Sequence, residues 1–171
     1  EADVRTIVAL VTPSGSAYWD SNRFPKIIGR WKIEKKGEET ISISPFFRDH
    51  SIVRRLFSIV DRKSDDRWNV THFHYVNWPD HGPPESSLFH VFLDCIDAEH
   101  PGSRYPLFVH CAAGIGRSGT FVAAHSLRRD VLAHTAADGP LIIKAAKRIL
   151  ELRMQRYRLL SRPSQLKAVI D

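Results

Sequence analysis

The strongest constraint in this chain of 171 residues is a short apolar run that leads directly into a cysteine, a glycine-containing loop and an arginine. The run spans Tyr105 to Val109, and the sequence continues as His110-Cys-Ala-Ala-Gly-Ile-Gly-Arg-Ser118. Continuous apolar residues predict a buried strand, and apolar residues at helical spacing from Phe121 to Val131 predict a helix after the loop. This succession brings the positive end of a helix to Cys111.

A loop of this composition can close around a dianion. Gly114 and Gly116 permit tight turns in which successive backbone N–H groups point inward, and Arg117 adds a planar fork of donors for two phosphate oxygens. An unperturbed thiol with a pKa near 8.5 is only about 3% ionised at pH 7, but a helix N-terminus and an adjacent guanidinium lower that pKa. The pattern therefore predicts a thiolate nucleophile at Cys111.

Two polar residues, His110 and Ser118, flank this loop and are further candidate catalytic residues. We expect the Ser118 hydroxyl to donate to the cysteine sulfur, which makes the sulfur a better leaving group. The alternative is that Cys111 is a buried structural thiol next to an ordinary glycine turn. The combination of cysteine, five-residue gap, arginine and hydroxyl favours the anion-binding interpretation.

Charge and cysteine content set the broad class. The 25 Lys and Arg residues against 19 Asp and Glu residues give a net charge of +6, which favours anionic partners. The basic residues are scattered, with only short pairs such as Arg128-Arg129, so we expect no nucleic-acid binding. Two cysteines without a disulfide framework indicate a reducing, cytoplasmic environment. The apolar run from Ile7 to Val11 is too short to span a membrane, so we expect no transmembrane segment.

The length predicts a single α/β domain over residues 1–171, with a mixed, twisted, largely central β-sheet flanked by helices. Runs of β-branched and aromatic residues between turn residues predict strands in the first half. These are Arg5–Val11, Ile27–Glu34, Thr40–Ser44, Ile52–Val60 and Trp68–Asn77. Helical spacing predicts helices in the second half. They begin near Ser86 or Ser87, after the glycine loop, at Gly139-Pro140, and between Ser161 and Pro163.

A second motif, Trp78-Pro-Asp-His-Gly82, lies between the last predicted strand of the first half and the next helix. An aspartate on such a loop is suited to protonate a leaving group, so Asp80 is the candidate general acid. Trp78 would anchor the loop. The alternative is a plain Pro-Asp turn. His72 and His74 share one face of a strand, but this pattern favours packing over a metal site, and we expect no metal.

The motifs resemble those of one known family. HCAAGIGRSGT resembles the signature loop of the protein tyrosine phosphatases, and WPDHG resembles their mobile acid loop. The similarity covers nearly the whole chain, through IVALV near the N-terminus, Tyr18-Trp19, HFHY and LRMQR. It implies the protein tyrosine phosphatase fold and the hydrolysis of phosphotyrosine in proteins during signal transduction, with no metal and no cofactor.

The resemblance also implies roles for individual residues. Cys111 attacks phosphorus while Asp80 protonates the tyrosyl oxygen, and Asp80 then deprotonates the water that hydrolyses the cysteinyl phosphate. Gln165 helps to position that water. The implied partners are tyrosine-phosphorylated proteins or peptides. The implied substrate-binding residues are Ala112, Ala113, Gly114, Ile115, Gly116, Arg117 and Asp80.

Three departures from the family pattern accompany the resemblance. The family's phosphotyrosine loop would precede Glu1, so we expect an N-terminally incomplete catalytic domain. The stretch from Thr12 to Ala17 is short and lacks the glutamate that braces the signature arginine in the family, so we expect Arg117 to be held less firmly. Ser161 stands where the family has the first of two glutamines. Gln155 is expected at the surface.

Two other functions stay open at this point. One is a pseudophosphatase that binds phosphotyrosine without hydrolysing it; the presence of Cys111, Arg117 and Asp80 argues against it. The other is a dual-specificity or phosphoinositide phosphatase. The signature loop lacks the additional lysines that help to bind inositol phosphates, which argues against that function.

Overall fold

The computed structural model describes residues 3–12, 17–20, 24–42, 51–100, 105–132 and 140–170. Its internal contacts divide the chain into two compact units. The first unit comprises residues 1–77 and 87–110 and contains the β-sheet; the second comprises residues 78–86 and 111–171 and contains most of the helices. The mixed α/β class predicted from the sequence is confirmed.

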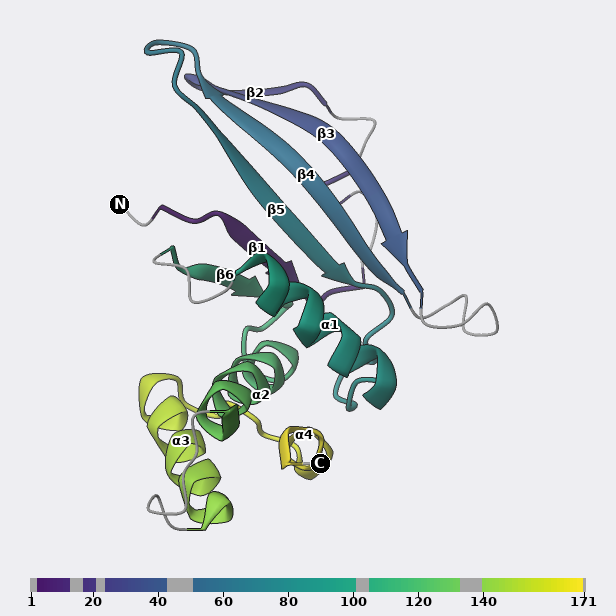
Figure 1. The fold of residues 1–171 in the computed structure, drawn as a ribbon, viewed down its shortest axis with the longest axis vertical. Helices are drawn as coiled ribbons and strands as arrows, with labels where there is room; N and C mark the ends of the chain where they lie inside the picture. The colour runs from purple at the N-terminus through teal and green to yellow at the C-terminus, as the bar shows by residue number, and fades with distance from the viewer. Residues whose placement is uncertain are drawn as a thin grey trace. The chain divides into compact units, whose positions relative to one another are not determined.

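The first unit is built on a six-stranded mixed sheet with the order β2-β3-β4-β5-β1-β6 (Figure 1). The strands β2 to β5 pair in antiparallel fashion, whereas β1 runs parallel to both β5 and β6. The strand bounds are β1 Thr6–Ala9, β2 Lys26–Ile28, β3 Trp31–Ile41, β4 Ile52–Asp61, β5 Arg67–Tyr75 and β6 Leu107–His110. Strands β1 and β6 run in the same direction and are paired up to their last residues, so the residues that follow them lie at the same end of the sheet.

The prediction of separate strands at Ile27–Glu34 and Thr40–Ser44 was wrong. The described part of this region forms a hairpin, in which Ile28 pairs with Trp31 across a two-residue turn. Gly29 has a φ of +59° in that turn, a left-handed conformation that glycine adopts without steric cost. The strand then continues unbroken to Ile41. The last two residues of the predicted second strand, at positions 43 and 44, lie outside the described residues.

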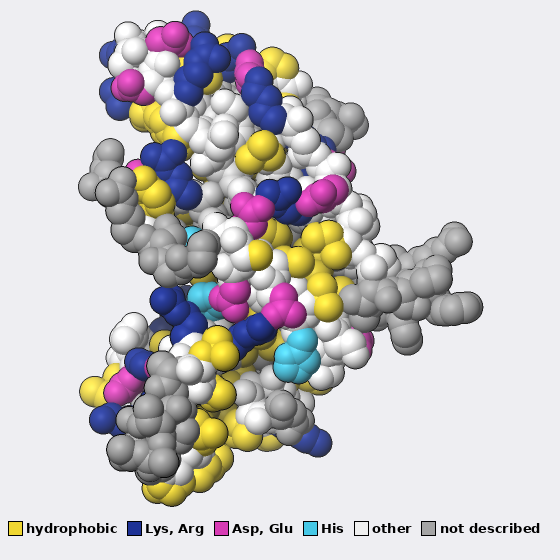
Figure 2. Space-filling view, viewed as in Figure 1, with side chains coloured by type: hydrophobic (Ala, Val, Ile, Leu, Met, Phe, Trp, Pro, Cys, Tyr) yellow, Lys and Arg dark blue, Asp and Glu magenta, His cyan; other side chains and the backbone are white. Residues whose placement is uncertain are grey.

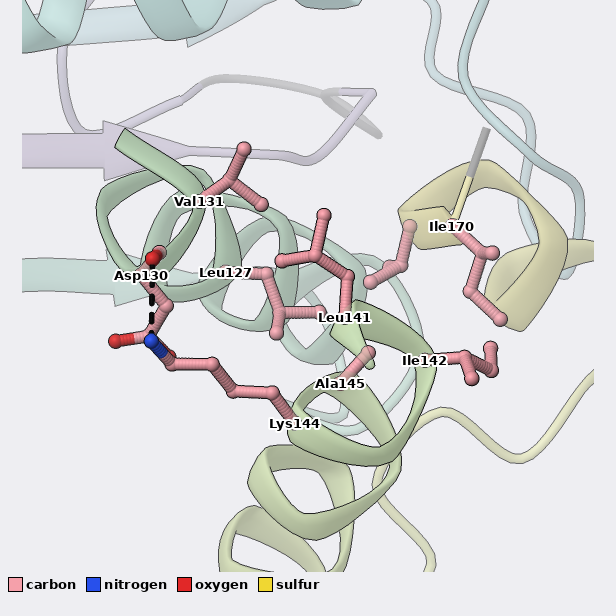
Figure 3. Close-up of a pocket in the computed structure, with 9 residues that line it drawn as sticks. Leu127, Asp130, Val131, Leu141, Ile142, Lys144, Ala145 and Ile170 are labelled. Atoms are coloured by element: carbon pink, nitrogen blue, oxygen red, sulfur yellow. Dashed lines mark hydrogen bonds between the residues drawn. The ribbon is translucent and has the colours of Figure 1, made fainter. Parts of the chain in front are cut away.

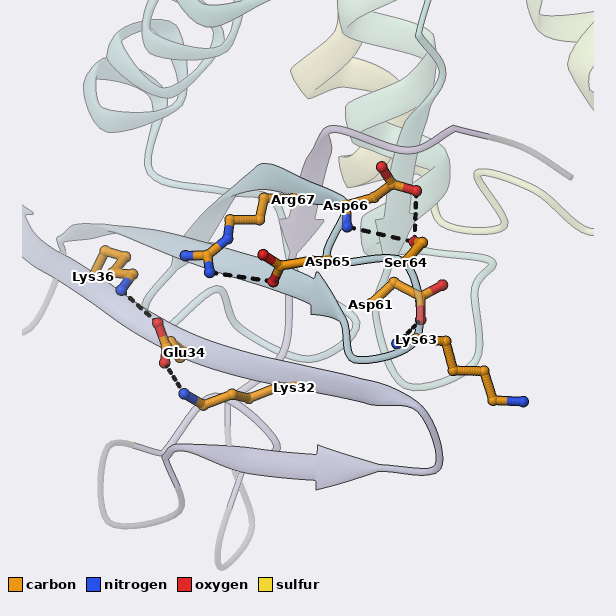
Figure 4. A network of polar contacts seen from close by, with 9 residues as sticks. All are labelled: Lys32, Glu34, Lys36, Asp61, Lys63, Ser64, Asp65, Asp66 and Arg67. Carbon is orange, nitrogen blue, oxygen red and sulfur yellow. Dashed lines mark hydrogen bonds and ion pairs between the residues drawn. The ribbon is translucent and has the colours of Figure 1, made fainter.

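The long strand β3 keeps an exposed face polar through alternating charges. Glu34 forms ion pairs with Lys32 and Lys36, which are two positions away on either side and share its face of the strand (Figure 4). Hydrogen bonds from Lys32 and Lys36 lower the pKa of Glu34 to about 2. Acidic and basic side chains also lie close together on the visible face of this unit (Figure 2).

Strand β6 was predicted to be buried, and this prediction was wrong. Within the described sheet β6 has a single neighbour, β1, and is therefore an edge strand. Its central residue, Phe108, is 52% exposed. The run from Leu107 to Val109 is apolar on both faces, but none of its residues is fully buried, and it pairs with a neighbouring strand along one edge only. Continuous hydrophobicity alone does not distinguish a central strand from an edge strand.

The core of the first unit lies between the sheet and helix α1, Ser86–Glu99. Phe92 of α1 is fully buried, and its ring meets those of Phe73 and Tyr75 edge-on, with centroids 6.5 Å and 5.3 Å apart. Figure 1 shows α1 lying along β5 on this face of the sheet. The helix begins where Ser86 or Ser87 predicted it.

The second unit contains three helices, α2 Arg117–Leu132, α3 Leu141–Gln155 and α4 Pro163–Ile170. Ala123, Ile149, Leu159 and Leu160 form its buried cluster. Pro140 is the N-cap of α3, with an extended ψ of 130°, rather than a residue of its first turn. Gly139 lies outside the described residues.

A small apolar cavity opens between the three helices of the second unit, where Leu127, Leu141 and Ile170 point into it (Figure 3). At its rim the Lys144 ammonium donates to the backbone carbonyl of Asp130 at 3.3 Å. The Asp130 carboxylate accepts from Arg148 at 3.0 Å and 3.2 Å. These contacts tie the start of α3 to the end of α2.

We predict that Phe92→Ala lowers the free energy of unfolding of the chain by roughly 3–5 kcal/mol, because the substitution leaves a cavity among buried aromatic rings. Phe108→Ala is the matched control. It removes the same atoms from a half-exposed site, and we expect a loss of about 1 kcal/mol or less. Urea unfolding followed by circular dichroism measures both; equal losses would contradict the assignment of the core.

Candidate active site

The loop from Cys111 to Gly116 connects the last strand of the sheet to helix α2, which begins at Arg117. Gly114 has a φ of +67°, and its backbone N–H donates to the Cys111 sulfur at 3.2 Å. Turning N–H groups inward in this way leaves the carbonyl groups of the loop pointing outward. The inward side is thereby an anion nest next to a thiol.

The outward carbonyls are paired by residues from the C-terminal segment and from α2. The Arg156 guanidinium donates to the carbonyls of Gly114 and Ala113 at 2.8 Å and 3.0 Å. The Leu160 N–H approaches the Ile115 carbonyl at 3.4 Å, and Thr120 donates through both its N–H and its hydroxyl to Gly116. The loop conformation therefore depends in part on residues about 40 positions further along the chain.

Arg156 is the main residue that the sequence interpretation missed. It ends the LRMQR stretch, which was noted only for its family resemblance. Its exposed position and its location at the end of α3 give no signal by themselves, since most exposed arginines are solvated. The neighbouring Gln155 is exposed, as predicted.

The Arg117 side chain is buried and held from within the second unit. One terminal nitrogen lies 3.5 Å from the Trp78 carbonyl, and the other forms an ion pair with Asp80 at 3.2 Å. The prediction that Arg117 is held less firmly was based on the stretch from Thr12 to Ala17. Most of that stretch lies outside the described residues, so this stays a prediction. Within the described part, the acid loop supplies the partners of this arginine.

The acid loop, Trp78 to Gly82, is held together at its ends and exposed at its tip. Trp78 is fully buried, and its indole N–H donates to the Gly82 carbonyl at 3.3 Å. The Gly82 N–H in turn lies 3.3 Å from the Pro79 carbonyl, which closes a tight turn. The Asp80 carboxylate at the tip is 67% exposed. The tryptophan thus fixes the loop while the carboxylate stays accessible.

The two cysteines differ in acidity. Burial raises the pKa of the Cys111 thiol, but the nearby hydroxyl and N–H of Ser118, together with the N–H groups of Gly114 and Ile115, outweigh burial and lower it. For Cys95 on α1, burial and the nearby Asp94 raise the pKa. Only Cys111 therefore has the environment of a reactive thiolate.

A cavity of about 400 Å³ brings most of the predicted site residues together. Gln165 is almost fully buried beside it, and its side-chain oxygen has no hydrogen-bond partner in the described structure. The Gln165 amide packs so closely on Gly116 that a Cβ there would lie 2.7 Å from its nitrogen. The lining residues are Asp80, His81, Cys111, Ala112, Ala113, Ile115, Gly116, Arg117, Arg158, Ser161, Arg162 and Gln165.

His110 is placed differently, in a polar cluster of the first unit. The Tyr18 hydroxyl lies 2.9 Å from His110 Nε2 and 3.1 Å from His72 Nε2. One hydroxyl can donate to only one of these nitrogens, so the other imidazole must donate to Tyr18. Burial raises the pKa of Tyr18 to about 12 and lowers that of His72 to about 2, so both are neutral at pH 7. The cluster fixes the residue immediately before Cys111.

His72 and His74 lie in this neighbourhood as packing and hydrogen-bonding groups. His74 Nε2 lies 2.8 Å from the Val11 carbonyl, and the Trp19 ring contacts both imidazoles. Across the described residues, histidine, cysteine and acidic side chains do not gather in groups of three or more suited to a metal ion.

One cavity thus combines a cysteine of lowered pKa, a buried arginine and an accessible carboxylate. The model of the protein-tyrosine phosphatase family matches residues 1–171. The chain belongs to this family.

Individual relatives agree with this assignment. The chain is 46% identical over 77 residues to tyrosine-protein phosphatase 2 of Dictyostelium discoideum, covering 44% of this chain and 20% of the relative. It is 28% identical over 163 residues to tyrosine-protein phosphatase 1 of Schizosaccharomyces pombe, covering 91% of this chain and 28% of the relative. The chain thus spans less than a third of the length of these relatives.

Solved structures share the fold. The catalytic domain of human protein tyrosine phosphatase non-receptor type 18 superposes with a TM-score of 0.80 at 21% identity, covering 98% of this chain and 58% of that one. Among the helices that the structure describes, none has both the length and the apolar character needed to cross a membrane.

We predict that iodoacetamide at pH 6 labels Cys111 at least roughly tenfold faster than Cys95, because thiolate is the reactive species. Mass spectrometry of the digested protein measures the two rates. Cys95→Ser should retain the fast labelling and Cys111→Ser should remove it. Equal rates at the two cysteines would refute an activated Cys111.

Proposed function

We propose that this chain is the catalytic part of an enzyme that hydrolyses phosphotyrosine in proteins through a cysteinyl-phosphate intermediate. The observation that carries the proposal is the cavity in which a thiol of lowered pKa, a buried arginine and an accessible aspartate converge. Membership of the family supports the same reaction.

Substrate binding uses the inward N–H groups of residues 112–117 and the fork of Arg117. A phosphate monoester is a dianion at pH 7, and a ring of N–H donors at a helix N-terminus is suited to its oxygens. Arg117 forms an ion pair with Asp80. A bound phosphate competes for the same guanidinium, so its arrival releases the Asp80 carboxylate.

In the first chemical step the Cys111 thiolate attacks phosphorus and the bond to the tyrosyl oxygen breaks. Asp80, once released from Arg117, takes up a proton from solvent and transfers it to that oxygen, so the product leaves as neutral tyrosine. Asp80 suits this role because its side chain is accessible at the tip of a loop anchored by Trp78. The step needs no metal, since Arg117 and the loop N–H groups balance the charge of the transferred group.

In the second step water attacks the cysteinyl phosphate, with Asp80 as the base that takes its proton. Gln165 is suited to orient this water, because its buried oxygen lacks a partner and lies beside the loop. Ser118 stabilises the departing thiolate, as its effect on the Cys111 pKa indicates. Ser161 also lines the cavity, so a hydroxyl takes the place of the first of the two family amides.

The substrates proposed are tyrosine-phosphorylated proteins or peptides. The structurally similar non-receptor type 18 phosphatase has been solved in complex with HER2 phosphopeptides; the likeness, at 20% identity, lies in the fold. A thiolate nucleophile requires a reducing compartment, so we propose that the catalytic unit acts in the cytoplasm.

The test is phosphate release from a phosphotyrosine peptide and from a matched phosphoserine peptide, without added metal. We expect release from phosphotyrosine only, and its complete loss in Cys111→Ser, because no other described group of the cavity is a comparable nucleophile. Cys95→Ser is the matched control and should retain the activity. Binding without release by the unaltered chain would instead identify a phosphotyrosine-binding pseudophosphatase.

We predict that Asp80→Ala slows turnover by roughly 10² to 10⁴ through loss of the general acid, whereas phosphotyrosine-peptide binding is retained or strengthened. Binding should not weaken because the substitution also frees Arg117 from its ion pair. Steady-state kinetics and peptide binding to the Asp80→Ala, Cys111→Ser double variant measure the two effects. Glu85→Ala, which removes a carboxylate from the same loop outside the cavity, is the control. Unchanged turnover in Asp80→Ala would exclude it as the acid.

A further inference from the structure

Three arginines line the active-site cavity, and the proposed chemistry uses only one of them. Arg117 is buried and ion-paired, whereas Arg158 and Arg162 are exposed. Within the described part of the chain, the guanidinium groups of Arg158 and Arg162 have no ion pair or hydrogen bond. Two guanidinium groups without a hydrogen bond or ion pair to a described residue therefore line the cavity in which the phosphate is proposed to bind.

The backbone that carries these arginines is fixed to the phosphate loop. Arg158 and Leu160 have φ values of 65° and 55°, which is uncommon for residues other than glycine. Arg153 donates to the carbonyls of Leu159 and Leu160, and the Leu160 N–H approaches the loop at Ile115. The left-handed turn is thus held from both sides, and it brings Arg158 into the cavity wall.

Arg162 is fixed in a similar way at the entry to α4. Its carbonyl accepts hydrogen bonds from the N–H groups of Gln165 and Leu166, at 3.1 Å and 3.2 Å. Gln165 in turn packs against Gly116 of the phosphate loop. Both side chains therefore project from an ordered backbone while their charged groups remain available.

The two unpaired guanidinium groups of the cavity favour a second anion. Its lining contains three guanidinium groups and a single carboxylate, that of Asp80, which is paired with Arg117. A phosphoryl group bound at the loop accepts from Arg117 and from the loop N–H groups, and the N–H donors of Arg158 and Arg162 stay unused. Exposed guanidinium groups bind carboxylate and phosphate oxygens through paired N–H donors.

We propose that Arg158 and Arg162 form a subsite for a second anionic group, carboxylate or phosphate, on a residue within two positions of the phosphotyrosine. This inference rests on the proposed function. When the phosphate reaches Cys111, the backbone of the peptide lies at the cavity mouth, and neighbouring side chains in an extended peptide are only about 3.3 Å further along per residue. The chain thus selects acidic or doubly phosphorylated phosphotyrosine segments.

The test compares three phosphotyrosine peptides of equal length, with glutamate, glutamine or phosphoserine at the positions within two residues of phosphotyrosine. We expect kcat/KM to be about 3- to 10-fold higher for the glutamate peptide than for the glutamine peptide, with the effect in KM, because the contact is the same in ground and transition states. The phosphoserine peptide should show at least the same increase in kcat/KM over the glutamine peptide. The preference should shrink as salt is raised.

Three variants assign the effect: Arg158→Gln, Arg162→Gln and the double variant. We expect the double variant to lose the preference, so that its kcat/KM values for the glutamate and glutamine peptides become equal. Arg129→Gln is the matched control, because it removes one exposed positive charge from α2 outside the cavity. A preference that survives in the double variant, or that Arg129→Gln also abolishes, would overturn the subsite.

A binding measurement separates this inference from the proposed catalysis. The Cys111→Ser variant is titrated with fluorescently labelled versions of the same peptides. Its Kd should be lower for the glutamate peptide than for the glutamine peptide, even if the unaltered chain released no phosphate. Equal Kd values for the glutamate and glutamine peptides would refute the subsite and leave the phosphatase proposal intact. Preferential hydrolysis of a soluble inositol phosphate over the acidic peptides would refute a peptide-selective subsite and indicate a phosphoinositide substrate.

Discussion

An anion-binding loop can turn its N–H groups inward only if its carbonyl groups find partners on the outside, and this constraint organises the second unit. In residues 111–116 the outward carbonyls of Ala113 and Gly114 are paired by Arg156, and that of Gly116 by Thr120. Gly114 and Gly116 are half-buried, and a carbonyl left without a partner in a buried position costs about 1–3 kcal/mol. The loop is therefore stable because α2 and the end of α3 supply its donors.

The same segment that braces the loop also shapes the cavity. Leu159 and Leu160 are buried in the cluster of the second unit, so the turn between α3 and α4 is fixed by packing as well as by the donors of Arg153. Packing therefore sets the positions of Gln165 and of the exposed arginines relative to the loop. A substitution in the hydrophobic cluster would reach the site through this turn, without touching any group that contacts substrate.

The sequence predicted the parts of the site that depend on residues adjacent in the chain. Cys111, the glycines and Arg117 are contiguous, and a strand, a tight loop and a helix N-terminus follow from the order of residue types. Asp80 was predicted from its short motif, and the structure brings it to Arg117. Arg156 could not be found in this way, because its partners lie 42 and 43 positions earlier. The edge position of β6 and the unbroken β3 were missed for the same reason: neighbouring strands determine them, and the strand pattern alone does not.

The ion pair between Asp80 and Arg117 links the two halves of the proposed mechanism. The Arg117 side chain is buried, so without an anion it needs a counter-charge, and the accessible carboxylate of Asp80 supplies it. A substrate phosphate provides the same counter-charge in a better geometry, since it offers two oxygens to the guanidinium fork. In the proposed mechanism, substrate binding thus releases the carboxylate from the ion pair, and it can then take up the proton that it donates to the leaving oxygen. An uncharged ligand of the cavity would leave the ion pair in place, so the coupling favours anions over neutral molecules of the same shape.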